Sequence, residues 1–204
     1  MSRPGRLAPP QSVVARRRAN AVELLAVLGA ALALRLLVAG PAGAASELGA
    51  ALFALLLLAA VAGAGWRPGR LRPSGLAWGL LGALGLVAGP ALLRFAGPLH
   101  PSLHLAASSF PLWALVATGV ALGEELVLRG ALFAAIDEAV GVKTALVVTT
   151  IVFALVHVPL YGVHALPLDL AVGLLLGGLR VASGGVAAPA TAHVLADLAG
   201  WWLW

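Results

Sequence analysis

Three charged residues stand close together in the stretch GEELVLRG, residues 123–130, which is otherwise apolar or glycine. On a helix Glu125 and Arg129 share a face, with the acid N-terminal to the base, which is the better order for an ion pair. Glu124 is turned by about 100° from Glu125 and has no such local partner. We therefore expect Glu125 to pair with Arg129, and Glu124 to find a partner on another helix.

Two histidines further along the chain occur in pairs of the same spacing. FALVH places Phe153 and His157 on one helical face, and HVLAD places His193 and Asp197 on one face. Histidine and carboxylate side chains are those that most often take up and return protons, so the two histidine pairs and the acids could together form an acid–base site. Expected helix lengths put Glu124, His157 and His193 about 12–21 Å from one membrane face, so the three can meet within the bilayer.

The composition shows how costly these charges are. The chain has 204 residues, of which 61% are hydrophobic and 10% charged, with a mean hydropathy of +1.02. Soluble proteins carry about 25% charged residues, so we expect a membrane protein. Because a charge at the bilayer centre costs about 2.5–3.5 kcal/mol, the charges there require partners and indicate a function.

The pattern predicts an all-α fold, a polytopic transmembrane bundle of about seven spans. A span takes about 20 apolar residues. The apolar stretches lie roughly at 19–40, 46–65, 75–95, 110–136, 143–158, 165–180 and 185–204. Residues 1–18 then form a basic cytoplasmic tail, and residues 19–107 hold the first three spans.

The basic residues predict the orientation. They precede the first span, lie between the second and third, and recur at later even-numbered junctions as Lys143 and Arg180, whereas only Arg94 flanks the other side. This positive-inside pattern indicates a cytoplasmic N-terminus. Since the basic residues sit at helix ends, the net charge of +5 reflects topology, and no nucleic-acid partner is expected.

The first three spans are expected to serve packing and anchoring. Their charged residues, Glu23, Arg35 and Glu47, can all be placed near helix ends, where long side chains snorkel. Two G-x-x-x-G patterns, at 119–123 and 173–177, are expected to allow close helix packing in the later spans.

The stretches EELVLR, FALVH and HVLAD, in this order in a helical bundle, resemble the CAAX-protease and bacteriocin-processing family of intramembrane glutamic endopeptidases. Each stretch alone is a weak signal, and the combination is a strong one. The resemblance covers about residues 108–204, which we expect to form the protease core. It implies a helical bundle around an intramembrane catalytic site that holds no metal and no cofactor.

The resemblance also implies roles for the matching residues. Glu124 would be the base, with His157 holding and polarising the same water. Glu125 paired with Arg129 would position the site and hold a substrate carboxylate, although a purely structural ion pair is an equal alternative.

The last motif departs from the commonest family pattern. His193 would stabilise the oxyanion, and the next motif position, often Asn in the family, is Asp197 here. An ionised carboxylate repels an oxyanion, so Asp197 serves only if protonated, or by orienting and charging His193. We favour the second role, because an acid beside a histidine commonly fixes its tautomer.

Other chemistries have less support. The chain has no cysteine, hence no thiol nucleophile, and it has neither H-E-x-x-H nor G-x-S-x-G. A zinc site from Glu124, Glu125, His157 and His193 is chemically conceivable, but the resemblance implies a metal-free mechanism.

Two functions of other classes stay open. A proton-coupled transporter would use the same residues as a relay, although many transporters show internal repeats and this chain shows none. A catalytically silent scaffold that binds hydrophobic peptides is compatible with Asp197.

For an active protease, the expected partners are the lipid bilayer and a membrane-anchored or hydrophobic protein tail, cut near the cytoplasmic half of the bilayer. The richness in Ala, Gly and Arg suggests a GC-rich bacterial genome, so we expect a multi-pass protein of the bacterial plasma membrane. Prenylated tails, bacteriocin leaders and C-terminal sorting signals are all handled by relatives and are not separated by the sequence.

Overall fold

The computed structural model describes residues 11–94 and 109–203, and none of these residues forms a strand. The helices are α1 (Gln11–Ala39), α2 (Glu47–Gly63), α3 (Pro73–Arg94), α4 (Phe110–Glu125), α5 (Phe133–Val140), α6 (Val142–Tyr161), α7 (Leu166–Ser183) and α8 (Ala187–Leu203). A π-helical turn, η2 (Leu126–Leu132), joins α4 to α5 in one continuous span, and short 3-10 turns, η1 (Gly40–Ala45) and η3 (Val163–Ala165), precede α2 and α7. With α4, η2 and α5 taken as one, these helices match the predicted all-α bundle, which is confirmed.

The outside of the bundle suits lipid. Four segments are long and apolar enough to cross a membrane: Ala21–Ala39, Phe110–Val140, Val142–Tyr161 and Val163–Ser183. The helix Glu47–Gly63 and the stretch Pro73–Gly89 are apolar but shorter. Many large apolar side chains face outward, as a bilayer-embedded surface requires and a soluble surface seldom shows. The chain is a membrane protein.

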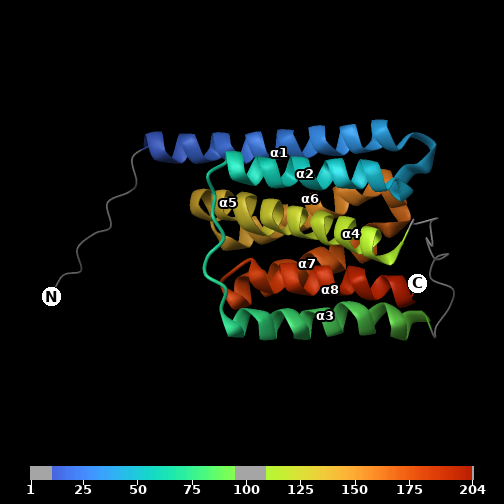
Figure 1. The fold of residues 1–204 in the computed structure, drawn as a ribbon. Coiled ribbons are helices and arrows are strands. Elements are labelled where there is room, and N and C mark those ends of the chain that lie inside the picture. Colours follow the sequence, from blue (N-terminus) through green and yellow to red (C-terminus); the bar gives the residue numbers. More distant parts are fainter. Residues whose placement is uncertain (1–10, 95–108, 204) are drawn as a thin grey trace.

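The N-terminal helices enclose the C-terminal ones from two sides (Figure 1). Helices α1 and α2 pack together, and α2 also packs on α4, whereas α3 crosses to the other side of the bundle and packs on α8 and α7. The polar motifs of α4, α6 and α8 therefore lie between these two walls, removed from lipid on both sides.

Glycines allow the helices to approach closely. In the predicted G-x-x-x-G of α4, a Cβ atom built on Gly123 would lie 3.1 Å from Leu57 of α2, and in that of α7 one on Gly173 would lie 3.2 Å from the Thr150 carbonyl oxygen of α6. The predicted packing role of both patterns agrees with these contacts.

The contact of α3 with α8 is closer still. A Cβ atom on Gly79 would lie 2.6 Å from the Thr191 Cβ atom and 2.9 Å from the Ala188 carbonyl oxygen. We expect Gly79→Ala to lower the free energy of unfolding by about 1–3 kcal/mol, because backbone must move to admit the methyl group. Thermal unfolding in detergent would measure the loss. Gly89→Ala is the matched control on the same helix, since its Cβ atom would meet nothing within 4 Å, and an equal melting temperature for both variants would contradict the prediction.

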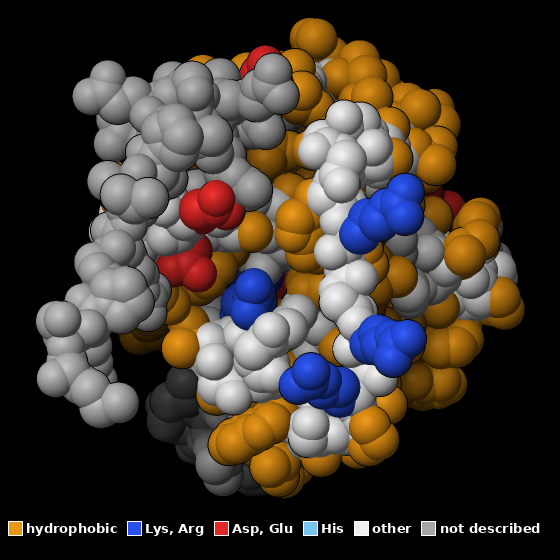
Figure 2. Space-filling model, turned by 90° about the vertical axis from the view of Figure 1, so that its left-hand side faces the viewer, with side chains coloured by type: hydrophobic (Ala, Val, Ile, Leu, Met, Phe, Trp, Pro, Cys, Tyr) orange, Lys and Arg blue, Asp and Glu red, His pale blue; other side chains and the backbone are white. Residues whose placement is uncertain are grey.

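The basic junctions lie at one end of the bundle. The α2–α3 connection, the α5–α6 turn and the α7–α8 turn all fall at the end that carries the start of α3 (Figure 1). Figure 2 shows lysine and arginine side chains gathered on that end. Arg67, Arg70, Arg72 and Lys143 are exposed there. These basic residues therefore lie together, as their positions at the even-numbered junctions predict.

Two arginines depart from the expectation. Arg35 is only 6% exposed and lies with its guanidinium 5.2 Å from the centre of the Phe53 ring, so the expected snorkelling is wrong for it. Arg180, expected only as a topological charge, is half-buried against the π-helical turn. In both cases the helix is rotated so that the side chain faces a neighbouring helix rather than the membrane surface.

The C-terminal tryptophans differ in their exposure. Trp202 is 73% exposed, whereas Trp201 packs against Phe110 and Trp113 at the start of α4, with ring centres 5.5 and 5.0 Å apart. Trp204, like Arg3 and Arg6 of the expected basic tail, lies outside the described residues.

Candidate active site

The EELVLR stretch spans the junction between α4 and the π-helical turn η2. Glu124 and Glu125 are the last two residues of α4, and Arg129 lies in the middle of the turn. All three are buried, at 2%, 0% and 0% exposure. A π-helical turn inside an α-helix is rare and is frequently found at functional sites.

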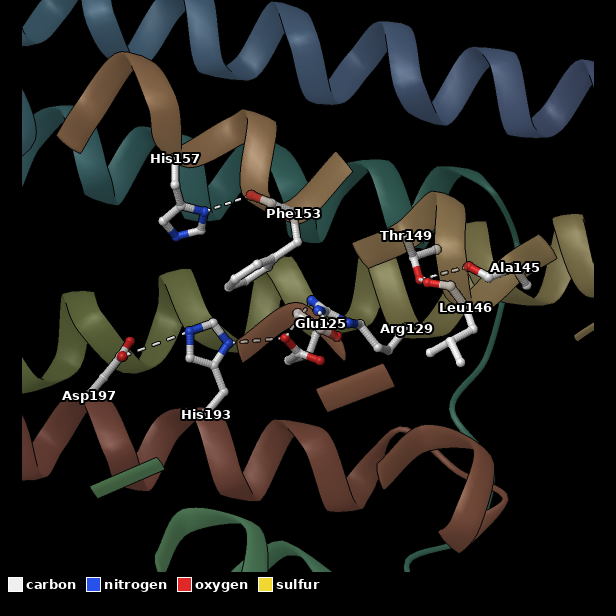
Figure 3. Close-up of polar contacts among 10 residues, drawn as sticks. Glu125, Arg129, Ala145, Leu146, Thr149, Phe153, His157, His193 and Asp197 are labelled. Carbon is white, nitrogen blue, oxygen red and sulfur yellow. Dashed lines mark hydrogen bonds and ion pairs between the residues drawn. The ribbon is translucent and has the colours of Figure 1, made fainter. Parts of the chain in front are cut away.

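The Glu125 carboxylate is the centre of the polar cluster (Figure 3). Its Oε1 atom accepts a hydrogen bond from Nη1 of Arg129, at 3.0 Å, and one from Nδ1 of His193, also at 3.0 Å. Its Oε2 atom is enclosed and has no hydrogen-bond partner among the described residues. The predicted pair of Glu125 with Arg129 is therefore present, and the structure adds His193 to it.

Arg129 joins the first motif to the second. Its guanidinium lies 4.5 Å from the centre of the Phe153 ring, and its Nη2 atom donates to the Gly173 carbonyl oxygen of α7 at 3.1 Å. A cation over an aromatic face is attracted by the ring electrons, most strongly where water is excluded. The Phe153 ring and the Gly173 carbonyl oxygen thus give this buried cation two contacts besides Glu125.

His157 is held in one tautomer by its own helix. Its Nδ1 atom lies 2.8 Å from the Phe153 carbonyl oxygen, which can only accept, so Nδ1 carries the proton. In the neutral ring, Nε2 then has a free lone pair and can accept a hydrogen bond from water. Tyr161 stacks on the ring, with centres 5.7 Å apart and an interplanar angle of 18°.

The two histidines face the same space from different helices. Figure 3 shows His157 reaching from α6 and His193 from α8, with Phe153 beside them. The Phe153 ring centre lies 4.4 Å from that of His157 and 5.7 Å from that of His193. Nε2 of His193 lies 3.7 Å from Oδ1 of Asp197, an ion-pair distance rather than a hydrogen bond. The HVLAD pair therefore lies together as its spacing predicts.

Glu124 differs from its neighbour. No hydrogen bond or ion pair to its carboxylate is seen within residues 11–94 and 109–203, so the expected partner on another helix is not found there; the interhelical histidine contact belongs to Glu125 instead. The enclosed polar atoms without partners include Oε2 of Glu125 but neither oxygen of Glu124.

The conceivable zinc ligands are not gathered as a metal site in the described part of the chain. Among those residues, no group of three or more His, Asp or Glu side chains is placed to hold a metal ion. Glu125 is instead engaged by Arg129 and His193.

His157 lies about as far from the basic end as expected, because it is 15 residues, or about 22 Å, after Val142, the first residue of α6. His157 is four residues before Tyr161, the last residue of α6, at the end of the bundle opposite the basic junctions (Figure 1). At about 1.5 Å per residue it lies about 6 Å from that end of the helix.

One further residue at the site was missed. Arg180 of α7 donates from Nε to the Arg129 carbonyl oxygen at 2.9 Å, and its guanidinium lies 5.0 Å from the centre of the Phe133 ring. The sequence gives no local signal for this contact, because an arginine near a helix end also fits a topological charge.

A model of a known protein family matches the part of the chain that carries the three motifs. The family model described as type II CAAX prenyl endopeptidase, Rce1-like, matches residues 106–199, which include all of the motif residues above. Neither a curated protein nor a solved structure matches the chain.

Proposed function

We propose that the chain cuts peptide bonds inside the membrane with a glutamate-activated water, because residues 106–199 match the family model of Rce1-like type II CAAX prenyl endopeptidases. The observation that carries the proposal is the state of Glu124. It is a buried carboxylate without a partner in the described residues, one position before a carboxylate that is fully engaged. An acid kept in that state inside a membrane bundle is a functional group by default.

The chemistry assigned to each residue follows from its contacts. Glu124 takes a proton from the attacking water, and the open Nε2 atom of His157 accepts a hydrogen bond from the same water. His157 needs no further partner to hold its tautomer, because Phe153 already fixes Nδ1. Glu124 then returns the proton to the leaving amine, so the base of the first step becomes the acid of the second.

Glu125, Arg129 and His193 would form the fixed frame of the site. The bond of Nδ1 to Glu125 holds the His193 ring with Nε2 toward Asp197, 3.7 Å away. A preorganised donor costs no reorganisation when charge develops, which is why we assign His193 to the oxyanion. Asp197 supports its cationic form from 3.7 Å.

The proposed substrate is a membrane-anchored or hydrophobic protein tail, and the proposed location is a bacterial plasma membrane with a cytoplasmic N-terminus. The gathering of Arg67, Arg70, Arg72 and Lys143 at one end supports that orientation. We further propose residues 108–204 as the protease core, with the helices of 19–107 as its lateral walls.

Mass spectrometry of new peptide termini tests the proposal. Membranes from cells that produce the wild type are compared with membranes containing Glu124→Gln, which keeps the shape and removes the base. We expect termini that appear only with the wild type, and a loss of about 10²- to 10⁴-fold in their rate of formation with the variant.

Glu23→Gln is the matched control, since Glu23 is exposed on α1. It should leave the termini unchanged. Identical termini with the wild type and Glu124→Gln, at equal levels of inserted protein, would sink the protease assignment and direct the next experiment to proton flux.

A further inference from the structure

Two arginines tie the π-helical turn η2 to α7 in opposite directions. Arg129 of η2 donates from Nη2 to the Gly173 carbonyl oxygen of α7 at 3.1 Å. Arg180 of α7 donates from Nε to the Arg129 carbonyl oxygen at 2.9 Å. Each arginine therefore binds the backbone of the other's segment, and α7 holds both the side chain and the main chain of Arg129.

The two attachment points on α7 are separated by about two helical turns. Gly173 and Arg180 are seven residues apart, which corresponds to about 10.5 Å along a helix. Contacts at two separated points resist both sliding and rotation of the turn, whereas one contact would resist only displacement. The main-chain position of Arg129 is thus fixed independently of its bond to Glu125.

Arg180 is itself held in place. Its guanidinium lies 5.0 Å from the centre of the Phe133 ring, and Phe133 is the first residue of α5, directly after the turn. An exposed topological arginine such as Arg70 has no corresponding contacts within the described residues, so location at the basic end does not explain the arrangement of Arg180.

We propose that Arg180 is a positioning residue of the active site. Its bond to the Arg129 carbonyl oxygen holds the π-helical turn in the register that aims Arg129 at Glu125. Through Oε1 of Glu125 the same register sets the Nδ1 contact of His193. The catalytic part of this proposal rests on the proposed function, while the structural link from Arg180 to His193 does not.

Arg180→Lys tests the link, because it keeps the positive charge at the basic end and removes the planar Nε donor. We expect kcat for a cleaved peptide to fall about 10- to 100-fold with KM within about twofold, as for a misplacement of catalytic groups by a fraction of an ångström to one ångström. Arg70→Lys at the same end is the matched control and should leave both constants unchanged.

Imidazole ¹⁵N signals of the histidines give a readout that needs no proteolysis. The Nδ1 signal of His193, assigned by its loss in His193→Gln, should shift in Arg180→Lys. The signals of His157 should not shift, since its Nδ1 bond lies within α6.

An unchanged His193 signal in a folded Arg180→Lys protein would overturn the proposal, as would an equal fall of kcat in Arg70→Lys. If the wild type shows no proteolysis but the His193 signal shifts as expected, the proposed function fails and the link from Arg180 to His193 stands.

Discussion

Removing either member of the Glu125–Arg129 pair alone is expected to leave little folded protein in the membrane. Both side chains have 0% exposure, and the Nη1 and Oε1 atoms lie 3.0 Å apart. Breaking a buried pair by removing one partner costs about 3–5 kcal/mol, because the other charge stays buried. Since proteins are stable by only about 5–15 kcal/mol, this loss is a large part of the total.

Glu125→Gln and Arg129→Met test this through the amount of inserted protein and its melting temperature in detergent. Glu125→Gln should be the milder of the two, because an amide oxygen can still accept from Arg129 and His193. Arg129→Met instead leaves Glu125 without its guanidinium partner and the Gly173 carbonyl oxygen without its donor. The double variant should recover part of the loss, since no unpaired charge remains. Wild-type levels and melting temperatures for both single variants would contradict the prediction.

Features fixed by spacing within one helix were predictable. The i, i+4 spacing placed Glu125 beside Arg129, and it placed His193 beside Asp197, because these relations depend only on helical geometry. The helix boundaries followed from apolar stretches of the length that a bilayer requires. The same reasoning placed the basic junctions at one end.

Features that depend on the rotation of one helix against another were not predictable. Whether Glu124 or Glu125 meets His193 is decided by a turn of about 100° of α4 relative to α8, which the sequence of either helix leaves undetermined. The π-helical turn changes that rotation locally. The apolar pattern around Arg129 does not predict the turn, because an ordinary α-helix would have the same pattern. Arg35 and Arg180 were misread for the same reason, since a residue near a helix end can face the lipid headgroups or a neighbouring helix.

The contacts of His193 distinguish two roles within HVLAD, namely donation to the oxyanion by His193 and support of its charge by Asp197. Nδ1 carries the proton that binds Glu125, so a neutral His193 has only a lone pair at Nε2 and cannot donate to an oxyanion. The oxyanion role therefore requires the imidazolium form, with protons on both nitrogens. Glu125 at 3.0 Å and Asp197 at 3.7 Å both favour that cation.

We expect His193→Ala to lower kcat by about 10²- to 10³-fold, the usual cost of losing one oxyanion donor. Asp197→Asn should retain activity, because Glu125 still supports the cation and the new amide can donate to the oxyanion itself. Single-turnover rates for the two variants on one peptide would measure both effects. If Asp197→Asn is as inactive as His193→Ala, Asp197 is an obligatory charge partner of His193, and Glu125 alone does not maintain the imidazolium.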